Sequence, residues 1–221
     1  MTATDIATKK NDSSGQPNTR ELILDAAEKL FAEQGIGATS IRAIIAAAKV
    51  NNASVHYHFG SKEILITEVF RRRASLITKE RLALLDAVPD DLPLLTRLEA
   101  IVRAFIRPGL FGADKSRVIA QRFAVFGARL VTENSELARD LMAQEYDEPG
   151  RRFLAALGDA TTGLSAHDLQ WRMHAMMGLL VYTMNRSNRI VSITHSAVDP
   201  NDDDAVLEEL VKIAVDIFRP R

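Results

Sequence analysis

The chain has 221 residues, of which 47% are hydrophobic, and its formal net charge of −1 excludes a uniformly basic nucleic-acid binder. Its lack of cysteine excludes disulfide bonds, thiolate catalysis and thiolate zinc sites, and makes the cytoplasm the expected compartment. No run of about 18 apolar residues is present, so we expect no membrane span, and the most apolar stretch, residues 173–184, is predicted to be a buried helix.

The N-terminal segment, residues 1–17, is expected to be a disordered tail. Its Ser, Thr, Gly, Pro and Asn residues cannot bury enough surface to become ordered, and it lacks the apolar core of a secretory signal. Asn18 is followed three residues later by Glu21, which resembles a capping box and predicts the start of a first helix. That helix is expected to end at Gly35.

Two short helices follow, separated by a turn of about three residues. The first is expected after a cap at Thr39, and the second spans residues 52–58 and ends at Gly60. Ser61 is expected to cap a long fourth helix over residues 62–85. Two short helices joined by a tight turn and braced by a longer helix have the layout of a helix-turn-helix, whose second helix enters the DNA major groove.

Beyond the turn that follows the fourth helix, apolar residues recur at helical spacing to the end of the chain. Five more helices are predicted, over residues 92–107, 115–131, 134–157, 166–186 and 203–218. We expect loops at residues 107–112 and 187–204, with a short strand at residues 189–197 as the alternative within the second loop. Pro149 and Gly150 are expected to kink or divide the third of these helices. The chain is therefore predicted to be all-α.

The stretch TSIRAIIAAAKVNNASVHYHFGSKEIL, residues 39–65, resembles the DNA-binding region of TetR-family transcriptional regulators. Its most specific part is YHFGSKE, and the similarity extends over about residues 19–70. The resemblance implies a homodimeric repressor of a pseudo-palindromic operator in double-stranded DNA, released by a ligand. It also implies a helix-turn-helix domain at residues 18–64 and a helical regulatory and dimerisation domain at residues 65–221. Family members contact the operator or its phosphates at the positions that are here Thr39, Ser40, Arg42, Asn51, Asn52, Ser54, His56, Tyr57, His58 and Lys62.

Physical chemistry assigns different roles to these side chains. Asn52 and Ser54 suit base edges, because Asn can pair with adenine bidentately and Ser with several bases. Tyr57 and His58 suit the DNA backbone, where they would position the helix without reading sequence. Lys62, beside the positive end of the fourth helix, suits a phosphate oxygen.

Two residues depart from the family pattern in the turn. Lys49 stands where the family usually has Gly, and a left-handed conformation there would cost about 1 kcal/mol. Ile45 replaces the customary small residue where the two helices approach, so the turn is expected to be slightly wider. The base contacts, and whether Arg42 reaches a base or a phosphate, depend on this geometry.

Other functions fit the sequence less well. His56 and His58 point about 200° apart on a helix and cannot chelate one metal ion. No catalytic set, P-loop or GxGxxG motif is present, so we expect no metal, no cofactor and no enzyme. The basic residues 71–73 are interpreted as solvated or interdomain charge. Two alternatives stay open: a small-molecule-binding or protein-interaction protein whose helix-turn-helix serves a non-DNA partner, and an all-helical enzyme.

The second domain contains most of the large apolar side chains, most of which are expected to pack a core. A helical bundle that encloses an apolar cavity with a few polar groups is also a common ligand site. Residues 170–180, QWRMHAMMGLL, are similar to the matching region of fatty-acid-responsive family members, which suggests an apolar or acyl-type effector. The candidate pocket residues are Phe105, Phe123, Phe126, Met142, Tyr146, Trp171, His174 and Met177.

The predicted helices over residues 166–186 and 203–218 carry wide apolar surfaces. Such helices need burial on two sides. In the resembling family the last two long helices pair with their copies in a four-helix dimer interface, so we expect these two helices to form a homodimer.

Overall fold

The computed structural model describes residues 18–112, 116–132, 135–184 and 189–219, and within these ranges it contains helices and no strand. This architecture confirms the predicted all-α fold class. The helices are α1 (Thr19–Gln34), α2 (Ile41–Ala48), α3 (Asn52–Phe59), α4 (Lys62–Asp86), α5 (Leu94–Phe111), α6 (Arg117–Thr132), α7 (Glu136–Asp159), α8 (Ala166–Met184), α9 (Arg189–Ile193) and α10 (Asp203–Phe218). The tail predicted at residues 1–17 lies outside the described residues.

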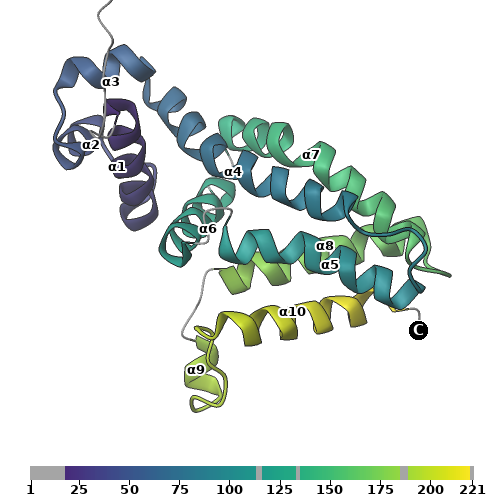
Figure 1. The fold of residues 1–221 in the computed structure, drawn as a ribbon. Coiled ribbons are helices and arrows are strands. Elements are labelled where there is room, and N and C mark those ends of the chain that lie inside the picture. Colours follow the sequence, from purple (N-terminus) through teal and green to yellow (C-terminus); the bar gives the residue numbers. More distant parts are fainter. Residues whose placement is uncertain (1–17, 113–115, 133–134, 185–188, 220–221) are drawn as a thin grey trace, which may run out of the picture.

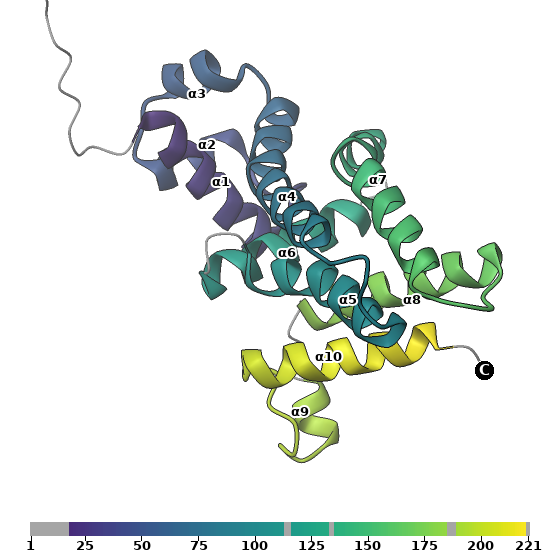
Figure 2. The ribbon, with the colours of Figure 1, turned by 45° about the vertical axis from the view of Figure 1, so that its right-hand side comes forward.

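The helices form a small head and a larger body (Figure 1). The head consists of α1, α2 and α3, and the 25-residue helix α4 runs from the head into the body. In the body α4 packs on α5 and α7, and α10 packs on α5 and α8, while α6 packs on α1 of the head. The turned view shows that α9 projects from the body below α10 (Figure 2). Head and body are therefore joined by α4 and by the contact between α1 and α6.

Two clusters of buried side chains fill the molecule. The first includes Phe31 of α1, Phe70 of α4 and Phe126 of α6, and the ring centroids of Phe31 and Phe126 are 5.5 Å apart. The second includes Phe105 of α5 and Phe153 of α7, whose rings meet edge to face at 5.1 Å. Because the first cluster joins the three helices of the head to α4, α6 and α7, the head shares its core with part of the body.

The loop predicted at residues 107–112 is wrong, because α5 continues to Phe111 and Gly112 ends it. Pro108 lies inside the last turns of α5, where its missing N–H leaves one carbonyl oxygen without its helical partner. Leu110 is buried in the second cluster. The helix therefore persists because its apolar side chains are buried, which offsets the cost of proline.

Two further predictions in the body are corrected. Helix α7 runs unbroken from Glu136 to Asp159 with Pro149 inside it, so the predicted division of this helix is wrong. In place of the loop or strand predicted at residues 189–197, residues 189–193 form the short helix α9. The Thr194 N–H donates to the Ile190 carbonyl oxygen, so this segment satisfies its backbone locally, as an isolated strand could not.

Candidate nucleic-acid interface

The residues between α1 and α2 hold these two helices together. The Thr39 hydroxyl donates to the carbonyl oxygen of Gly35 at 2.7 Å and lies 3.2 Å from the carbonyl oxygen of Leu30. Thr39 is buried, with 1% of its surface exposed. The N-cap of α2 is Ser40, whose hydroxyl oxygen accepts from the Ala43 N–H. The cap predicted at Thr39 is therefore wrong, because the Thr39 hydroxyl already binds the end of α1.

Lys49 forms the turn between α2 and α3 in the left-handed conformation, with φ 55° and ψ 40°. Its N–H donates to the carbonyl oxygens at the end of α2, and the Val50 N–H donates to the Ile45 carbonyl oxygen. A residue with a Cβ costs about 1 kcal/mol more than glycine here. The exposed Lys49 side chain stands three residues before the first residue of α3.

Helix α3 is anchored at its N-terminus and along one face. Asn51 is its N-cap, and its side-chain oxygen accepts from the N–H and from the hydroxyl of Ser54, both at 2.8 Å. Val55 and Phe59, four residues apart on one face of α3, are buried in the first cluster. The opposite face of α3 is left without support from the protein.

The outward side of α3 carries polar groups that have no partner in the described part of the chain. Asn52 and His56 are four residues apart on one side of the helix and both are exposed. Beside them Tyr57 is 85% exposed, and Arg42 of α2 is exposed and unpaired within the same described ranges. A highly exposed aromatic ring beside unpaired amide, imidazole and guanidinium groups is typical of a surface that binds another molecule.

His58 and Lys62 lie where α3 ends and α4 begins. The His58 ring is half-buried and meets the Tyr57 ring edge to face, with 5.1 Å between centroids. The Lys62 ammonium donates to the Ile36 carbonyl oxygen at 2.6 Å, so it fastens the loop before α2 to the start of α4. Ser61 is the N-cap of α4, as predicted.

Arginines of α4 pair with acidic residues of α1. The Glu28 carboxylate accepts from Arg72 Nη2 at 2.5 Å and from Arg73 Nε at 3.1 Å, and Glu28 is only 3% exposed. Arg72 also pairs with Glu21 and Asp25. These contacts confirm the interpretation of residues 72 and 73 as interdomain charge. Their partner Glu28 was missed by sequence reasoning, because an acidic residue on a helix is usually solvated.

The predicted pocket residues do not come together in one cavity. Phe123 and Phe126 belong to the first cluster, against which Met142 and Tyr146 pack. Phe105 belongs to the second cluster. Burial raises the pKa of the Tyr146 hydroxyl to about 12, since water is excluded from its charged form.

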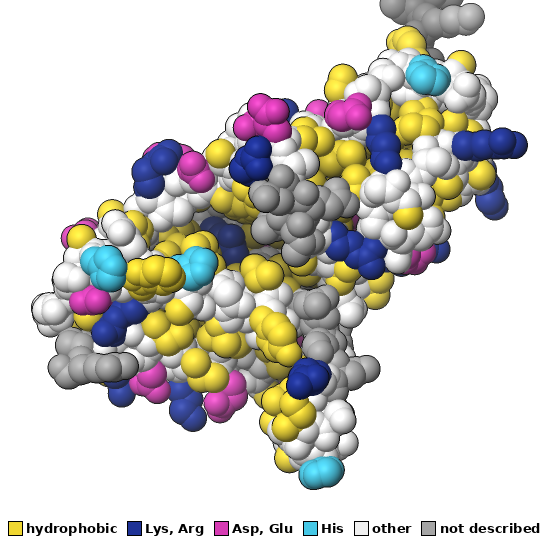
Figure 3. Space-filling model, turned by 180° about the vertical axis from the view of Figure 1, so that it is seen from behind, with side chains coloured by type: hydrophobic (Ala, Val, Ile, Leu, Met, Phe, Trp, Pro, Cys, Tyr) yellow, Lys and Arg dark blue, Asp and Glu magenta, His cyan; other side chains and the backbone are white. Residues whose placement is uncertain are grey.

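The remaining predicted pocket residues, Trp171, His174 and Met177, lie on the exposed side of α8. Trp171 is 62% exposed, and Val181 and Tyr182 continue the exposed apolar surface along the same helix. The view from behind shows hydrophobic side chains gathered over this face, beside a hollow in which a basic side chain is visible (Figure 3).

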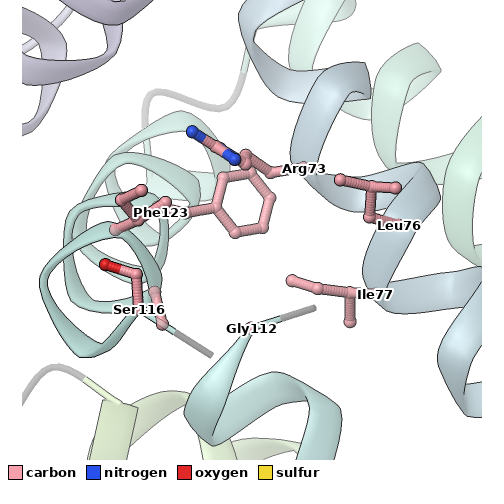
Figure 4. A pocket seen from close by; sticks show the side chains of 8 residues that line it. Arg73, Leu76, Ile77, Gly112, Ser116 and Phe123 are labelled. Atoms are coloured by element: carbon pink, nitrogen blue, oxygen red, sulfur yellow. The ribbon is translucent and has the colours of Figure 1, made fainter. Parts of the chain in front are cut away.

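A small, partly open pocket lies between α4 and α6, with a free volume of about 10 Å³ (Figure 4). It is lined by Arg73 and Ile77 of α4, by Phe123 of α6 and by Gly112 at the end of α5. The Arg73 guanidinium lies beside the Phe123 ring. Because Arg73 also pairs with Glu28, the pocket borders the ion pairs that link the body to the head.

Two family models match the chain. Residues 23–69 match the model described as bacterial regulatory proteins, tetR family, and residues 103–215 match the model described as tetracyclin repressor-like, C-terminal domain. The chain belongs to the TetR family. Membership confirms the resemblance noted in the sequence and the fold of an N-terminal helix-turn-helix followed by a helical domain. Regulators of this family bind DNA and act as dimers, and the relatives that match are named as transcriptional regulators.

Relatives of this TetR-family chain include two named regulators. The HTH-type transcriptional repressor KstR2 of Rhodococcus jostii (strain RHA1) is 43% identical over 61 residues, which is 28% of this chain and 30% of the relative. The HTH-type transcriptional regulator AcrR of Shigella flexneri is 34% identical over 133 residues, which is 58% of this chain and 60% of the relative. The chain thus spans 30% and 60% of the length of these relatives.

Solved structures share the fold. The fatty acid degradation regulator FadR from Bacillus halodurans has a TM-score of 0.64 at 17% identity, covering 94% of this chain and 100% of that one. A TetR-like transcriptional regulator from Rhodococcus sp. RHA1 has a TM-score of 0.61 at 19% identity, covering 90% and 96%. In the described ranges no helix is long and apolar enough to span a membrane.

Proposed function

We propose that this TetR-family protein is a transcriptional repressor that binds a pseudo-palindromic DNA operator as a homodimer and leaves it when an effector binds. The unpartnered face of α3 carries this proposal, since Asn52, His56 and Tyr57 project from a helix held by Val55 and Phe59. A helix that reads the major groove needs its outward side chains free and its backbone fixed by the fold. With DNA as its partner, the protein would act in the cytoplasm.

The side chains of α3 divide into reading and positioning groups. Asn52 reads bases, because its free amide can bond adenine bidentately. The Ser54 hydroxyl already donates to Asn51, so it would meet a base edge as an acceptor. Tyr57 and His58 contact the sugar-phosphate backbone, which orients the helix without reading sequence.

The starts of α2 and α4 supply contacts to phosphates. Ser40 and Arg42 are exposed at the first turn of α2, where backbone N–H groups favour an anion. The Thr39 hydroxyl is enclosed, so Thr39 would contact a phosphate through its backbone. Lys62 keeps N–H groups beyond the one given to Ile36, and it stands at the positive end of α4.

The homodimer would form through α8 and α10. The exposed apolar residues of α8, together with Ile213 on α10, support this interface, because such a surface favours association. Val181→Glu is expected to give a species near 24.4 kDa in sedimentation, where the wild type gives twice that mass. Val118→Glu, at an equally exposed valine on α6, is the matched control and should stay dimeric. A wild type that sediments as a monomer at micromolar concentration would contradict the proposal.

The effector would act through the pocket between α4 and α6. Arg73 lines this pocket and pairs with Glu28 on α1, so a ligand that moves α4 against α6 also moves the head. An effector releases DNA only if it binds the released conformation more tightly than the DNA-bound one. We propose residues 18–64 as the DNA-binding unit and residues 65–221 as the unit that senses the effector and dimerises.

Selection from a pool of random DNA fragments at about 0.15 M salt tests the proposed function directly. A two-fold-symmetric motif is expected, with half-sites about 34 to 36 Å apart or more. If the dimeric protein shows no salt-dependent DNA affinity, its helix-turn-helix serves another partner, and the alternative of a protein-interaction or small-molecule-binding protein is favoured.

A further inference from the structure

Arg81 lies inside the body, where α4, α5, α7 and α8 meet, and is only 9% exposed. Its Nε donates to the Phe105 carbonyl oxygen at 2.8 Å, and its guanidinium lies over the Phe105 ring, 4.2 Å from the centroid. At Gly109 an added Cβ would stand 2.9 Å from Arg81 Nη2 and 3.1 Å from Leu180 Cδ2. The glycine therefore leaves the room that the guanidinium occupies between α5 and α8.

No carboxylate of the described residues pairs with Arg81. A guanidinium has five N–H donors, and the Phe105 carbonyl oxygen accepts one of them. Burial lowers the pKa of Arg81, and Tyr146 is the titratable group of the described chain that acts on its charge. Tyr146 is neutral at physiological pH. A buried cation without an anion is unfavourable, so this site is suited to an anion from outside the chain.

The free polar groups at this site are not completely sealed from solvent. Two side-chain atoms of the described residues are fully enclosed and lack a hydrogen-bond partner. They are Nε of Arg72 and Nε of Arg97. The terminal nitrogens of Arg81 and the Tyr146 hydroxyl are not among these enclosed atoms. They have no hydrogen-bond partner in the described chain. Their surroundings are apolar, since the Phe70 ring meets the Tyr146 ring edge to face at 5.9 Å.

We propose that Arg81 binds the carboxylate of the effector, that the Tyr146 hydroxyl donates a second hydrogen bond to it, and that the effector is a carboxylic acid with an apolar body. A single guanidinium balances one negative charge, whereas a doubly charged phosphate ester would stay partly uncompensated in this apolar interior. Ile77, about 6 Å along α4 on the same face, lines the pocket of Figure 4, so an apolar body that extends from the carboxylate along this face of α4 would reach that pocket. This inference rests on the proposed function and names the chemistry of its effector.

Octanoate and octanamide, which share an alkyl chain and differ in charge, are the probes. Binding to the full-length protein is measured by calorimetry and by the shift in melting temperature. We expect octanoate to bind at least tenfold more tightly than octanamide, because hydrogen bonds to charged groups are the stronger ones. Arg81→Met should abolish this preference, and Tyr146→Phe should weaken octanoate binding by about tenfold. Arg107→Met, at an arginine paired with Glu80 and partly exposed, is the matched control and should keep the preference.

Equal affinity for the two probes, binding of neither, or a preference that survives in Arg81→Met would overturn the inference. If Arg81→Met does not fold, the wild-type comparison and Tyr146→Phe decide. DNA binding is measured in parallel on the selected operator without either probe. A protein that binds the operator but does not prefer octanoate contradicts the Arg81 inference alone, whereas a protein that binds no DNA contradicts the proposed function.

Discussion

Replacing Glu28 by glutamine tests how strongly the head is fastened to the body. The carboxylate of Glu28 is buried and shared by Arg72 Nη2 at 2.5 Å and Arg73 Nε at 3.1 Å. The amide of glutamine has almost the same shape, so Glu28→Gln removes the charge and leaves the packing. The two guanidinium groups are themselves mostly buried, with 16% and 14% of their side chains exposed.

The expected loss is about 2 kcal/mol in the free energy of unfolding. Removing one partner of a buried ion pair typically costs roughly 3 to 5 kcal/mol. The cost is smaller here because Arg72 keeps Glu21 at 3.0 Å and Asp25 at 2.8 Å, and the glutamine oxygen still accepts a hydrogen bond. Asp25→Asn is the matched control on the same helix, and because that side chain is 64% exposed its loss should stay below about 0.5 kcal/mol.

Urea unfolding followed by circular dichroism, at one fixed protein concentration, measures both variants. The reasoning is refuted if Glu28→Gln and Asp25→Asn lower the free energy of unfolding equally. It is also refuted if the loss for Glu28→Gln is below about 0.5 kcal/mol, because burial would then add nothing to this ion pair.

Four further substitutions have defined outcomes. Lys49→Gly should raise the free energy of unfolding by about 1 kcal/mol in urea titrations, and no gain would contradict the strain assigned to the turn. In anisotropy titrations Asn52→Ala should alter the preference among DNA sequences, whereas Lys62→Ala should weaken binding to every DNA and lower the slope of log affinity against log salt concentration by about one. Equal losses of affinity on all sites for both variants would remove the distinction between a residue that reads bases and one that positions the helix. Burial raises the pKa of Tyr146 from 10.0 to about 12, because it favours the neutral hydroxyl in the folded protein. The contribution of the buried neutral Tyr146 to the free energy of unfolding is therefore complete below pH 10 and is lost as the pH rises to 12. An alkaline absorbance titration should show a component near pH 12 that Tyr146→Phe lacks, and its persistence in that variant would contradict the assignment.

The arrangement also suggests how the two ends of the molecule communicate. The first hydrophobic cluster runs from the head into α6 and α7, and the Glu28 ion pairs tie α1 to α4 beside the pocket. A displacement of α4 therefore changes contacts in the head directly. The expected consequence is that Glu28→Gln alters the effector concentration needed for release as well as stability.

The sequence by itself determined the helix-turn-helix and most of the helix ends. Caps such as Asn18 and Ser61 depend on residues a few positions apart, so they can be predicted without knowledge of the fold. The family pattern placed Lys49 in the turn, but whether its backbone is left-handed was decided only by the structure.

Only the tertiary structure decided which charges are buried and which aromatic residues meet. Glu28 binds arginines 44 and 45 positions away, and Arg81 binds a carbonyl oxygen 24 positions away, so no local pattern distinguishes them from solvated charges. The predicted pocket residues are scattered over two clusters and an exposed helix face for the same reason, and α5 continues through Pro108 because its neighbours are buried. Helical periodicity shows that a side chain is on an apolar face, but packing between distant helices determines what that face contacts.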